Sequence, residues 1–152
     1  MLDYLDIATM DEHRDFSLYI IKIYADIFTK EEKIEWDSVL TTSGGHAGEN
    51  ETSLIMECAP DTVKMEYQRF DEPISPLKRT NHLGGVSTSF WWYADYPENV
   101  TGTPSAATRE KGAKLMDIRV KALVRAIKTI KADTSLPELQ KEFIERKSNK
   151  GK

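Results

Sequence analysis

The sequence has little of the material that several classes of protein need. Its single cysteine, Cys58, cannot form an internal disulfide, and one cysteine with three histidines does not give the spacing of a zinc finger. No apolar run is long enough to span a bilayer, and the amino terminus lacks the basic start and apolar stretch of a signal peptide. We therefore expect a cytoplasmic protein without membrane contact, in which Cys58 is a small core residue.

An excess of positive charge is lacking too. The 21 basic residues are outnumbered by 25 acidic ones, and the formal net charge is -4. Basic residues gather only in the last third, where Lys121, Arg125, Lys128 and Lys131 have the spacing of the solvated face of a helix. Because phosphate recognition depends on a clustered positive surface, we expect no nucleic-acid partner.

What the sequence does contain is typical of a globular protein. Of its 152 residues, 39% are hydrophobic and 30% are charged. A chain of this length buries enough surface to fold without disulfides or a structural metal. We expect a single domain over residues 1–147 and a disordered basic tail over residues 148–152.

Apolar residues three and four positions apart predict helices near both ends of the chain. The expected helices run from Asp11 to about Phe28, from Glu49 to Ala59, from Ser105 or Thr108 to about Lys131, and from Ser135 to about Arg146. In the second of these, Leu54, Ile55 and Cys58 are expected to point inward. At the start of the last one, Ser135 and Glu138 have the spacing of a capping box.

Between these helices the pattern is weaker. The segment from Ile34 to Thr41 carries Trp36 and Val39 and ends in turn residues, which favours a strand or an extended connection. Residues 61–103 are rich in Pro, Gly, Asn and aromatic side chains and show little periodicity. A loop of that length in a compact domain is usually functional or covers a partner.

The residue types that carry chemistry gather between Gly44 and Ser53. Two glycines permit a sharp turn that presents His46, and an imidazole, which titrates near neutral pH, is suited to proton transfer. Glu51 lies about a turn further on, close enough to orient such a histidine, whereas Glu49 and Glu51 are two positions apart and should point away from one another on a helix. The alternative is that both are acidic residues at a helix amino terminus and that His46 is a surface turn residue.

An ordered series of segments resembles the creatininase family. The series comprises His46 to Ser53 with the sequence HAGENETS, residues 54–56 and 60–63, Thr88 to Ala94, Gly102 to Gly112, and Lys131 to Thr134. The first of these is similar to the family's HAGxxETS segment, and the resemblance covers about residues 44–143. An ordered series is far more specific than any one motif.

The resemblance implies an α/β fold with a parallel-sheet core flanked by helices, commonly assembled as a hexamer. It also implies a two-metal site, with zinc, manganese or iron, that activates water to attack a C–N bond. By position, His46 corresponds to a proton shuttle and Glu51 to a neighbouring active-site carboxylate. The candidates for substrate contacts are Gly45, Glu49, Trp91 and Trp92.

The family's metal ligands come from an amino-terminal Glu-x-His segment, a nearby Asp and a middle Asn-Gly-His motif, none of which this chain contains. His13 and His82 are expected to be surface residues and not substitutes. The resemblance is thus to the carboxy-terminal half only, a partial fold lacking the amino-terminal metal-binding half. The chain is then a truncated gene product, one of two complementary chains, or a half kept for a noncatalytic purpose.

Two departures bear on the substrate. Creatininase has an acidic residue directly before the shuttle histidine and a tryptophan shortly upstream, where this chain has Gly45 and Thr42. We therefore expect a small cyclic amide or formamide-like substrate other than creatinine. Trp91 and Trp92 would form a pocket wall or an oligomer contact, or one of them would fill the core. The competing hypothesis is a noncatalytic assembly subunit that packs through this aromatic loop and the last two helices.

Overall fold

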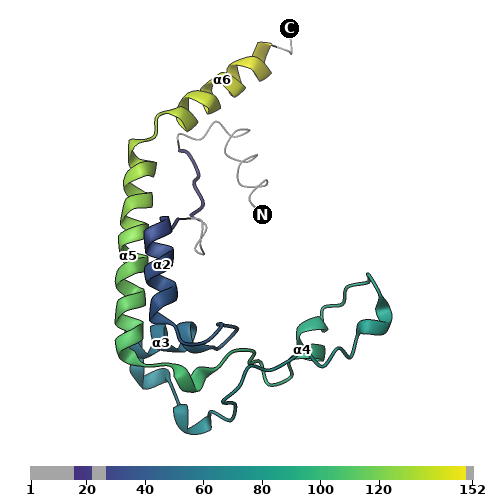
Figure 1. Cartoon of the computed structure of the whole chain (residues 1–152). Helices are drawn as coiled ribbons and strands as arrows, with labels where there is room; N and C mark the ends of the chain where they lie inside the picture. The colour runs from purple at the N-terminus through teal and green to yellow at the C-terminus, as the bar shows by residue number, and fades with distance from the viewer. Residues whose placement is uncertain (1–15, 22–26, 150–152) are drawn as a thin grey trace. The chain divides into compact units, whose positions relative to one another are not determined.

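The computed structural model describes residues 16–21 and 27–149, and its regular structure within these ranges is entirely helical (Figure 1). The α-helices are α2 (Lys30–Val39), α3 (Glu49–Cys58), α4 (Trp91–Asp95), α5 (Arg109–Ala132) and α6 (Ser135–Asn149). Short 3-10 turns lie at Pro60–Thr62, Met65–Tyr67, Asn81–Leu83 and Pro104–Ala106. The described residues contain no strand, so the expected α/β fold with a parallel-sheet core is wrong for this part of the chain.

The strand or extended connection expected over residues 34–41 is wrong, because most of these residues lie in α2. The cap at the start of α2 shows why. The Thr29 hydroxyl accepts a hydrogen bond from the amide of Glu32 (3.1 Å), and the Glu32 carboxylate accepts one from the amide of Thr29 (2.8 Å). This reciprocal capping box satisfies two backbone donors and starts α2 at Lys30. The cap outweighs the preference of Trp36 and Val39 for extended structure.

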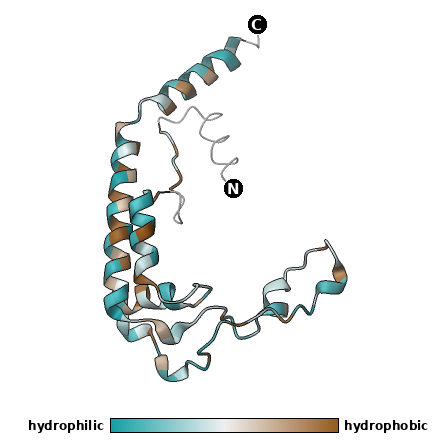
Figure 2. Ribbon diagram, in the orientation of Figure 1, coloured by the Kyte–Doolittle hydropathy of each residue, from teal (hydrophilic) through white to brown (hydrophobic). Residues whose placement is uncertain are grey.

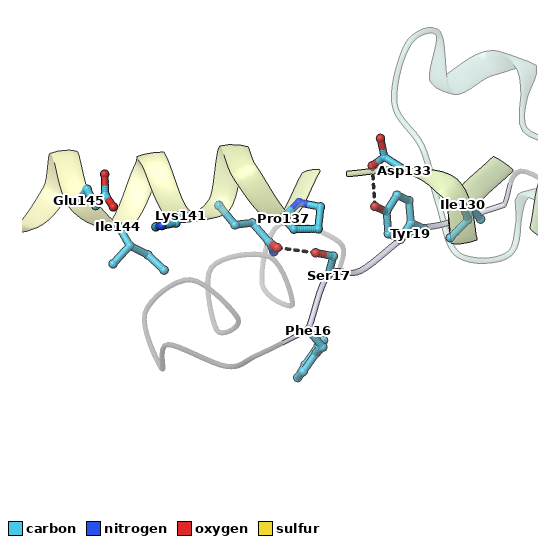
Figure 3. Close-up of a pocket in the computed structure, with 10 residues that line it drawn as sticks. Phe16, Ser17, Tyr19, Ile130, Asp133, Pro137, Lys141, Ile144 and Glu145 are labelled. Atoms are coloured by element: carbon cyan, nitrogen blue, oxygen red, sulfur yellow. Dashed lines mark hydrogen bonds between the residues drawn. The ribbon is translucent and has the colours of Figure 1, made fainter. Parts of the chain in front are cut away.

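The helix expected over residues 11–28 is also wrong where the structure describes it. Residues 16–21 form no helix, and the rest of that range, apart from Ile27 and Phe28, lies outside the described residues. Side chains two positions apart point to the same side of an extended chain. Ser17 accordingly donates to Gln140 (2.5 Å), and Tyr19 donates to Asp133 (2.6 Å) (Figure 3).

Contacts divide the chain into two compact units, residues 28–121 and residues 1–27 with 122–152. In the second unit, Ser17 and Tyr19 border an open groove whose apolar lining includes Phe16, Ile130 and Ile144 (Figure 3). Ser148 and Asn149 belong to α6. The single domain over residues 1–147 stays a prediction, as does the basic tail.

The start of α6 is capped by Asp133 and not, as expected, by Ser135. The carboxylate of Asp133 accepts hydrogen bonds from the amides of Ser135 and Leu136, each at 3.1 Å. The hydroxyls of Ser135 and Tyr19 also donate to it, and these bonds together hold the pKa of Asp133 below its ordinary range. None of the helices in the described ranges is long and apolar enough to cross a membrane.

The core of the 28–121 unit is formed by α2, α3 and α5. Trp36, Leu54, Leu115 and Ile118 are its buried members, and α2 lies alongside α5 in Figure 1. The ring of Phe28 packs on that of Trp36 with the centroids 5.3 Å apart.

The inward face of α3 differs from the one expected. Leu54 is buried as predicted, but Ile55 is 47% exposed and Cys58 is exposed, so the prediction was wrong for both. The face that meets α5 carries the buried polar residues Glu49 and Ser53. The positions of apolar residues were therefore not enough to predict this face.

A glycine lets α3 and α5 approach one another closely. A Cβ atom added to Gly112 would lie 1.9 Å from the carbonyl oxygen of Ser53. Beside this crossing, the hydroxyl of Ser53 accepts a hydrogen bond from the amide of Thr108 (3.1 Å). The hydroxyl of Thr108 in turn accepts one from the amide of Lys111 (3.2 Å), which confirms Thr108 as a cap of the long helix.

We expect Gly112→Ala to lower the free energy of unfolding by about 1–3 kcal/mol, because the methyl group collides with the backbone of α3. Urea denaturation monitored by circular dichroism measures this change. The matched control is Gly85→Ala, since a Cβ at Gly85 meets nothing within 4 Å. An equal effect of the two substitutions would contradict the close approach of α3 and α5.

Candidate functional site

The turn before α3 is built around glycines that contact a distant segment. Gly44 and Gly45 have φ angles of 84° and 113°, a region that L-residues rarely adopt. A Cβ on Gly45 would lie 2.8 Å from the Cα of Gly102. The turn therefore rests directly on the chain around Gly102, and the structure places Gly45 at this backbone contact.

The backbone of His46 is bonded to the same distant segment. Its amide donates to the Thr101 hydroxyl (2.7 Å), and its carbonyl accepts from the amides of Thr101 (3.0 Å) and Gly102 (3.1 Å). Both polar backbone groups of His46 are thus satisfied by residues more than fifty positions away.

The side chain of His46 faces Glu51. Nδ1 lies 3.4 Å from Oε2 of Glu51, within ion-pair contact, and the two side chains are 45% and 41% exposed. The same Oε2 accepts a hydrogen bond from the amide of Ala47 (2.8 Å), which anchors the carboxylate at the start of α3. Glu51 thus lies within reach of the imidazole, and its role at the site stays a prediction.

Aromatic side chains border the histidine on another side. The ring of Trp92 meets that of His46 edge to face, with centroids 5.4 Å apart and planes at 86°. Trp92 is held in turn by its indole N–H, which donates to Asn99 (2.6 Å), and by the ring of Tyr96 at 4.8 Å. Trp91 packs edge to face on Trp92 and is 53% exposed, so it does not fill the core.

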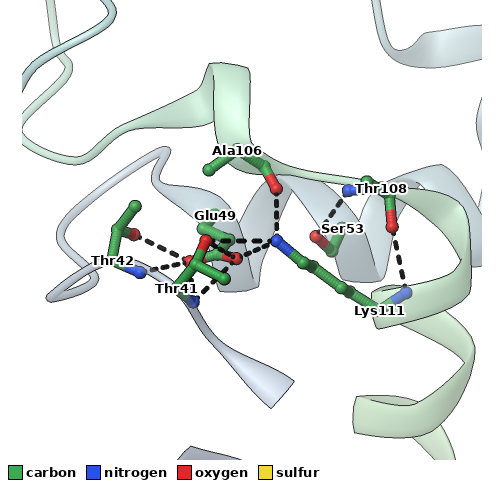
Figure 4. Close-up of polar contacts among 7 residues, drawn as sticks. All are labelled: Thr41, Thr42, Glu49, Ser53, Ala106, Thr108 and Lys111. Carbon is green, nitrogen blue, oxygen red and sulfur yellow. Dashed lines mark hydrogen bonds and ion pairs between the residues drawn. The ribbon is translucent and has the colours of Figure 1, made fainter. Parts of the chain in front are cut away.

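Glu49 lies on the buried side of α3 and is completely inaccessible to solvent (Figure 4). Its carboxylate accepts hydrogen bonds from the amides and hydroxyls of Thr41 and Thr42 at 2.7–3.0 Å, and it forms an ion pair with Lys111. The ammonium of Lys111 also donates to the carbonyl of Ala106 (2.8 Å). Glu49 therefore joins three segments of the chain.

Burial by itself would raise the pKa of Glu49. The hydrogen bonds from Lys111, Thr41 and Thr42 act in the opposite direction and outweigh burial, so the pKa is lowered to about 2. The carboxylate is therefore ionised at neutral pH, and its hydrogen-bonding capacity is already occupied within the protein. A substrate contact by Glu49 stays a prediction without direct support from this geometry.

Sequence reasoning missed three residues of this site: Asn99, Thr101 and Lys111. The last lies in the run Gly102 to Gly112 that resembled the creatininase family, but no spacing rule pointed to its partner 62 positions away. His82 is exposed in the turn Asn81–Leu83, and His13 lies outside the described residues. Within the described ranges, no group of three or more His, Cys, Asp and Glu side chains is arranged to hold a metal ion.

The site thus pairs a solvent-accessible histidine with a carboxylate beside an aromatic wall, and a histidine in such a place can transfer a proton. The family model for creatininase, described as creatinine amidohydrolase, matches residues 5–127, and the chain belongs to that family. Neither a curated protein nor a solved structure matches the chain. Because the family match begins at residue 5, well before Gly44, it does not confirm a resemblance to the carboxy-terminal half only.

We expect Glu49→Gln to reduce stability most at neutral pH. Since the pKa of Glu49 is lowered from 4.5 to about 2 by folding, its ionised form stabilises the native state fully above pH 4.5. That contribution is lost as the pH falls from about 4.5 to about 2. The stability difference between wild type and Glu49→Gln should therefore narrow over this window.

Urea denaturation at pH 7, 4.5 and 3 tests this expectation. The control is Glu66→Gln, which removes an exposed carboxylate from the turn Met65–Tyr67. A difference that stayed constant with pH would show that the charge of Glu49 does not stabilise the fold.

Proposed function

We propose that this chain supplies the proton-transfer part of an amidohydrolase site that cleaves a C–N bond of a cyclic amide or formamide-like substrate. Membership of the creatininase family supports amide hydrolysis as the reaction class. The observation that carries the proposal for this chain is the contact between Nδ1 of His46 and Oε2 of Glu51.

The two side chains have different roles in this proposal. With Nδ1 facing Glu51, the other ring nitrogen, Nε2, is the one available to a substrate. Water adds to the carbonyl carbon and gives a proton to the imidazole. The imidazole then donates a proton from Nε2 to the departing nitrogen as the C–N bond breaks, so that the amine leaves neutral. The Glu51 carboxylate keeps the ring oriented and stabilises its positive charge before that transfer.

The family resemblance also implies a divalent metal: zinc, manganese or iron. The described residues do not fit such a group, because they bring together only one histidine and one accessible carboxylate at this site. We therefore derive no step through a metal. The proposal assigns the metal ligands to a complementary half.

The substrate contacts proposed for Gly45, Trp91 and Trp92 differ in their support. Trp92 is already packed against the imidazole, which favours it as the wall against which a small amide would lie. Trp91 extends that wall into solvent. Gly45 could contribute only its backbone, because a Cβ atom there would collide with the backbone of Gly102.

Reconstitution tests this function. The chain would be mixed with a creatininase-family half that carries the Glu-x-His and Asn-Gly-His motifs, together with zinc, manganese or iron, and supplied with a panel of cyclic amides and formamides. We expect hydrolysis that falls by about 10²–10⁴-fold in His46→Ala, because the leaving nitrogen loses its proton donor. His82→Ala is the matched control and should change nothing. Undiminished turnover by His46→Ala would disprove the role of His46.

A noncatalytic assembly subunit is the second candidate, and exposed apolar side chains favour it. On α6, Leu139 and Phe143 are 58% and 47% exposed, and Figure 2 shows apolar residues along this helix. They lie four positions apart, on one face of the helix. Exposed apolar groups of this kind often mark interfaces between chains.

We expect the Leu139→Glu, Phe143→Glu double variant to reduce self-association of the chain, because it places charges on the apolar face of α6. Light scattering coupled to size-exclusion chromatography measures the mass. Lys141→Glu, on the same helix, is the control for a change of charge alone. A wild-type chain that is monomeric at all concentrations would count against both the assembly role and a homo-oligomer.

A further inference from the structure

His46 is about half exposed, and its imidazole is contacted by the ring of Trp92 and by the carboxylate of Glu51. Side-chain packing alone therefore holds the imidazole weakly. A group that transfers a proton has to be held close to its productive position, since a displacement of about 1 Å can lower the rate by about 10²-fold. The direction of this side chain must depend strongly on how the backbone of His46 is held.

The backbone is held on both sides of the Cα atom by one residue. Thr101 accepts a hydrogen bond from the amide of His46 through its hydroxyl (2.7 Å) and donates its own amide to the carbonyl of His46 (3.0 Å). Anchoring the peptide groups before and after a Cα atom fixes the direction of its Cα–Cβ bond. The Gly102 amide reinforces the second anchor at 3.1 Å.

Close packing also restricts the position of the Thr101 hydroxyl. A Cβ on Gly45 would lie 2.9 Å from this oxygen, so the hydroxyl is in close contact with the backbone directly before His46. The neighbouring residue Asn99, with a φ of 57°, binds the indole N–H of Trp92, the ring that meets the imidazole. Residues 99–102 thus hold His46 by its backbone and, through Trp92, by its ring.

From these contacts we propose that Thr101 is the positioning residue of the site: it orients His46 toward Glu51 and Trp92 without touching the substrate. This inference rests on the proposed proton-transfer role of His46 for its functional meaning. The hydroxyl, and not the shape of the side chain, carries the effect, because it accepts the His46 amide. Thr101→Val, which keeps the shape, should lose the orientation, and Thr101→Ser, which keeps the hydroxyl, should retain it.

Nuclear magnetic resonance of the isolated chain tests the proposal without any need for hydrolysis. In wild type and in Thr101→Ser, we expect nuclear Overhauser contacts between the His46 and Trp92 rings and a His46 amide that exchanges slowly with solvent. In Thr101→Val, the contacts between the rings should disappear and amide exchange of His46 should accelerate by about fivefold or more. The matched control is Thr129→Val on α5, where the hydroxyl bonds only within its own helix (3.2 Å).

Each result decides the matter. Unchanged contacts between the rings and unchanged exchange in a folded Thr101→Val would overturn the proposal, as would their loss in Thr101→Ser. If Thr101→Val does not fold, hydrogen exchange of the His46 amide in the wild-type chain tests the proposal instead. Exchange at the rate of an unstructured peptide would show that Thr101 does not hold the backbone of His46. If the resonance data agree but reconstituted chains never hydrolyse an amide, the positioning stands and the proposed function fails.

Discussion

The 28–121 unit depends on one buried carboxylate. Removing a charge from water costs several kcal/mol, and a buried acid persists only where cations and hydrogen-bond donors surround it. Glu49 meets this requirement through Lys111, Thr41 and Thr42, which come from the start of α5 and the chain after α2. Satisfying this single charge therefore draws together the elements that enclose the core of Trp36, Leu54, Leu115 and Ile118.

The burial of Glu49 also determines which residues of α3 face solvent. Once Glu49 and Ser53 face inward, the helix period places Glu51 toward solvent, next to the turn that presents His46. One side of the helix is structural, and the opposite side carries the carboxylate proposed to orient His46. The inward side of α3 is polar, which explains why Ile55 and Cys58 are exposed. Their apolar side chains had led to the expectation that they point inward.

Signals between residues close in the sequence predicted some of the helices, but other elements were predicted wrongly. The limits of α3 and α5 followed from Pro60 and from the Thr108 cap, which act on residues within one turn. The capping box of Thr29 and Glu32 was an equally local signal, but the β-forming residues that follow it led to the wrong expectation of an extended segment. The sheet was expected only from the family resemblance, and nothing in the periodicity of the described residues formed one.

The sequence by itself determined the family, the position of the histidine behind its glycines, and the separation of about one helical turn that lets Glu51 reach it. Only the tertiary structure decided that Thr101 holds the backbone of His46 and that Lys111 neutralises Glu49. These partners are 55 and 62 positions apart in the chain. Pairing over such distances is set by how the helices pack, and no spacing rule within a single element encodes it.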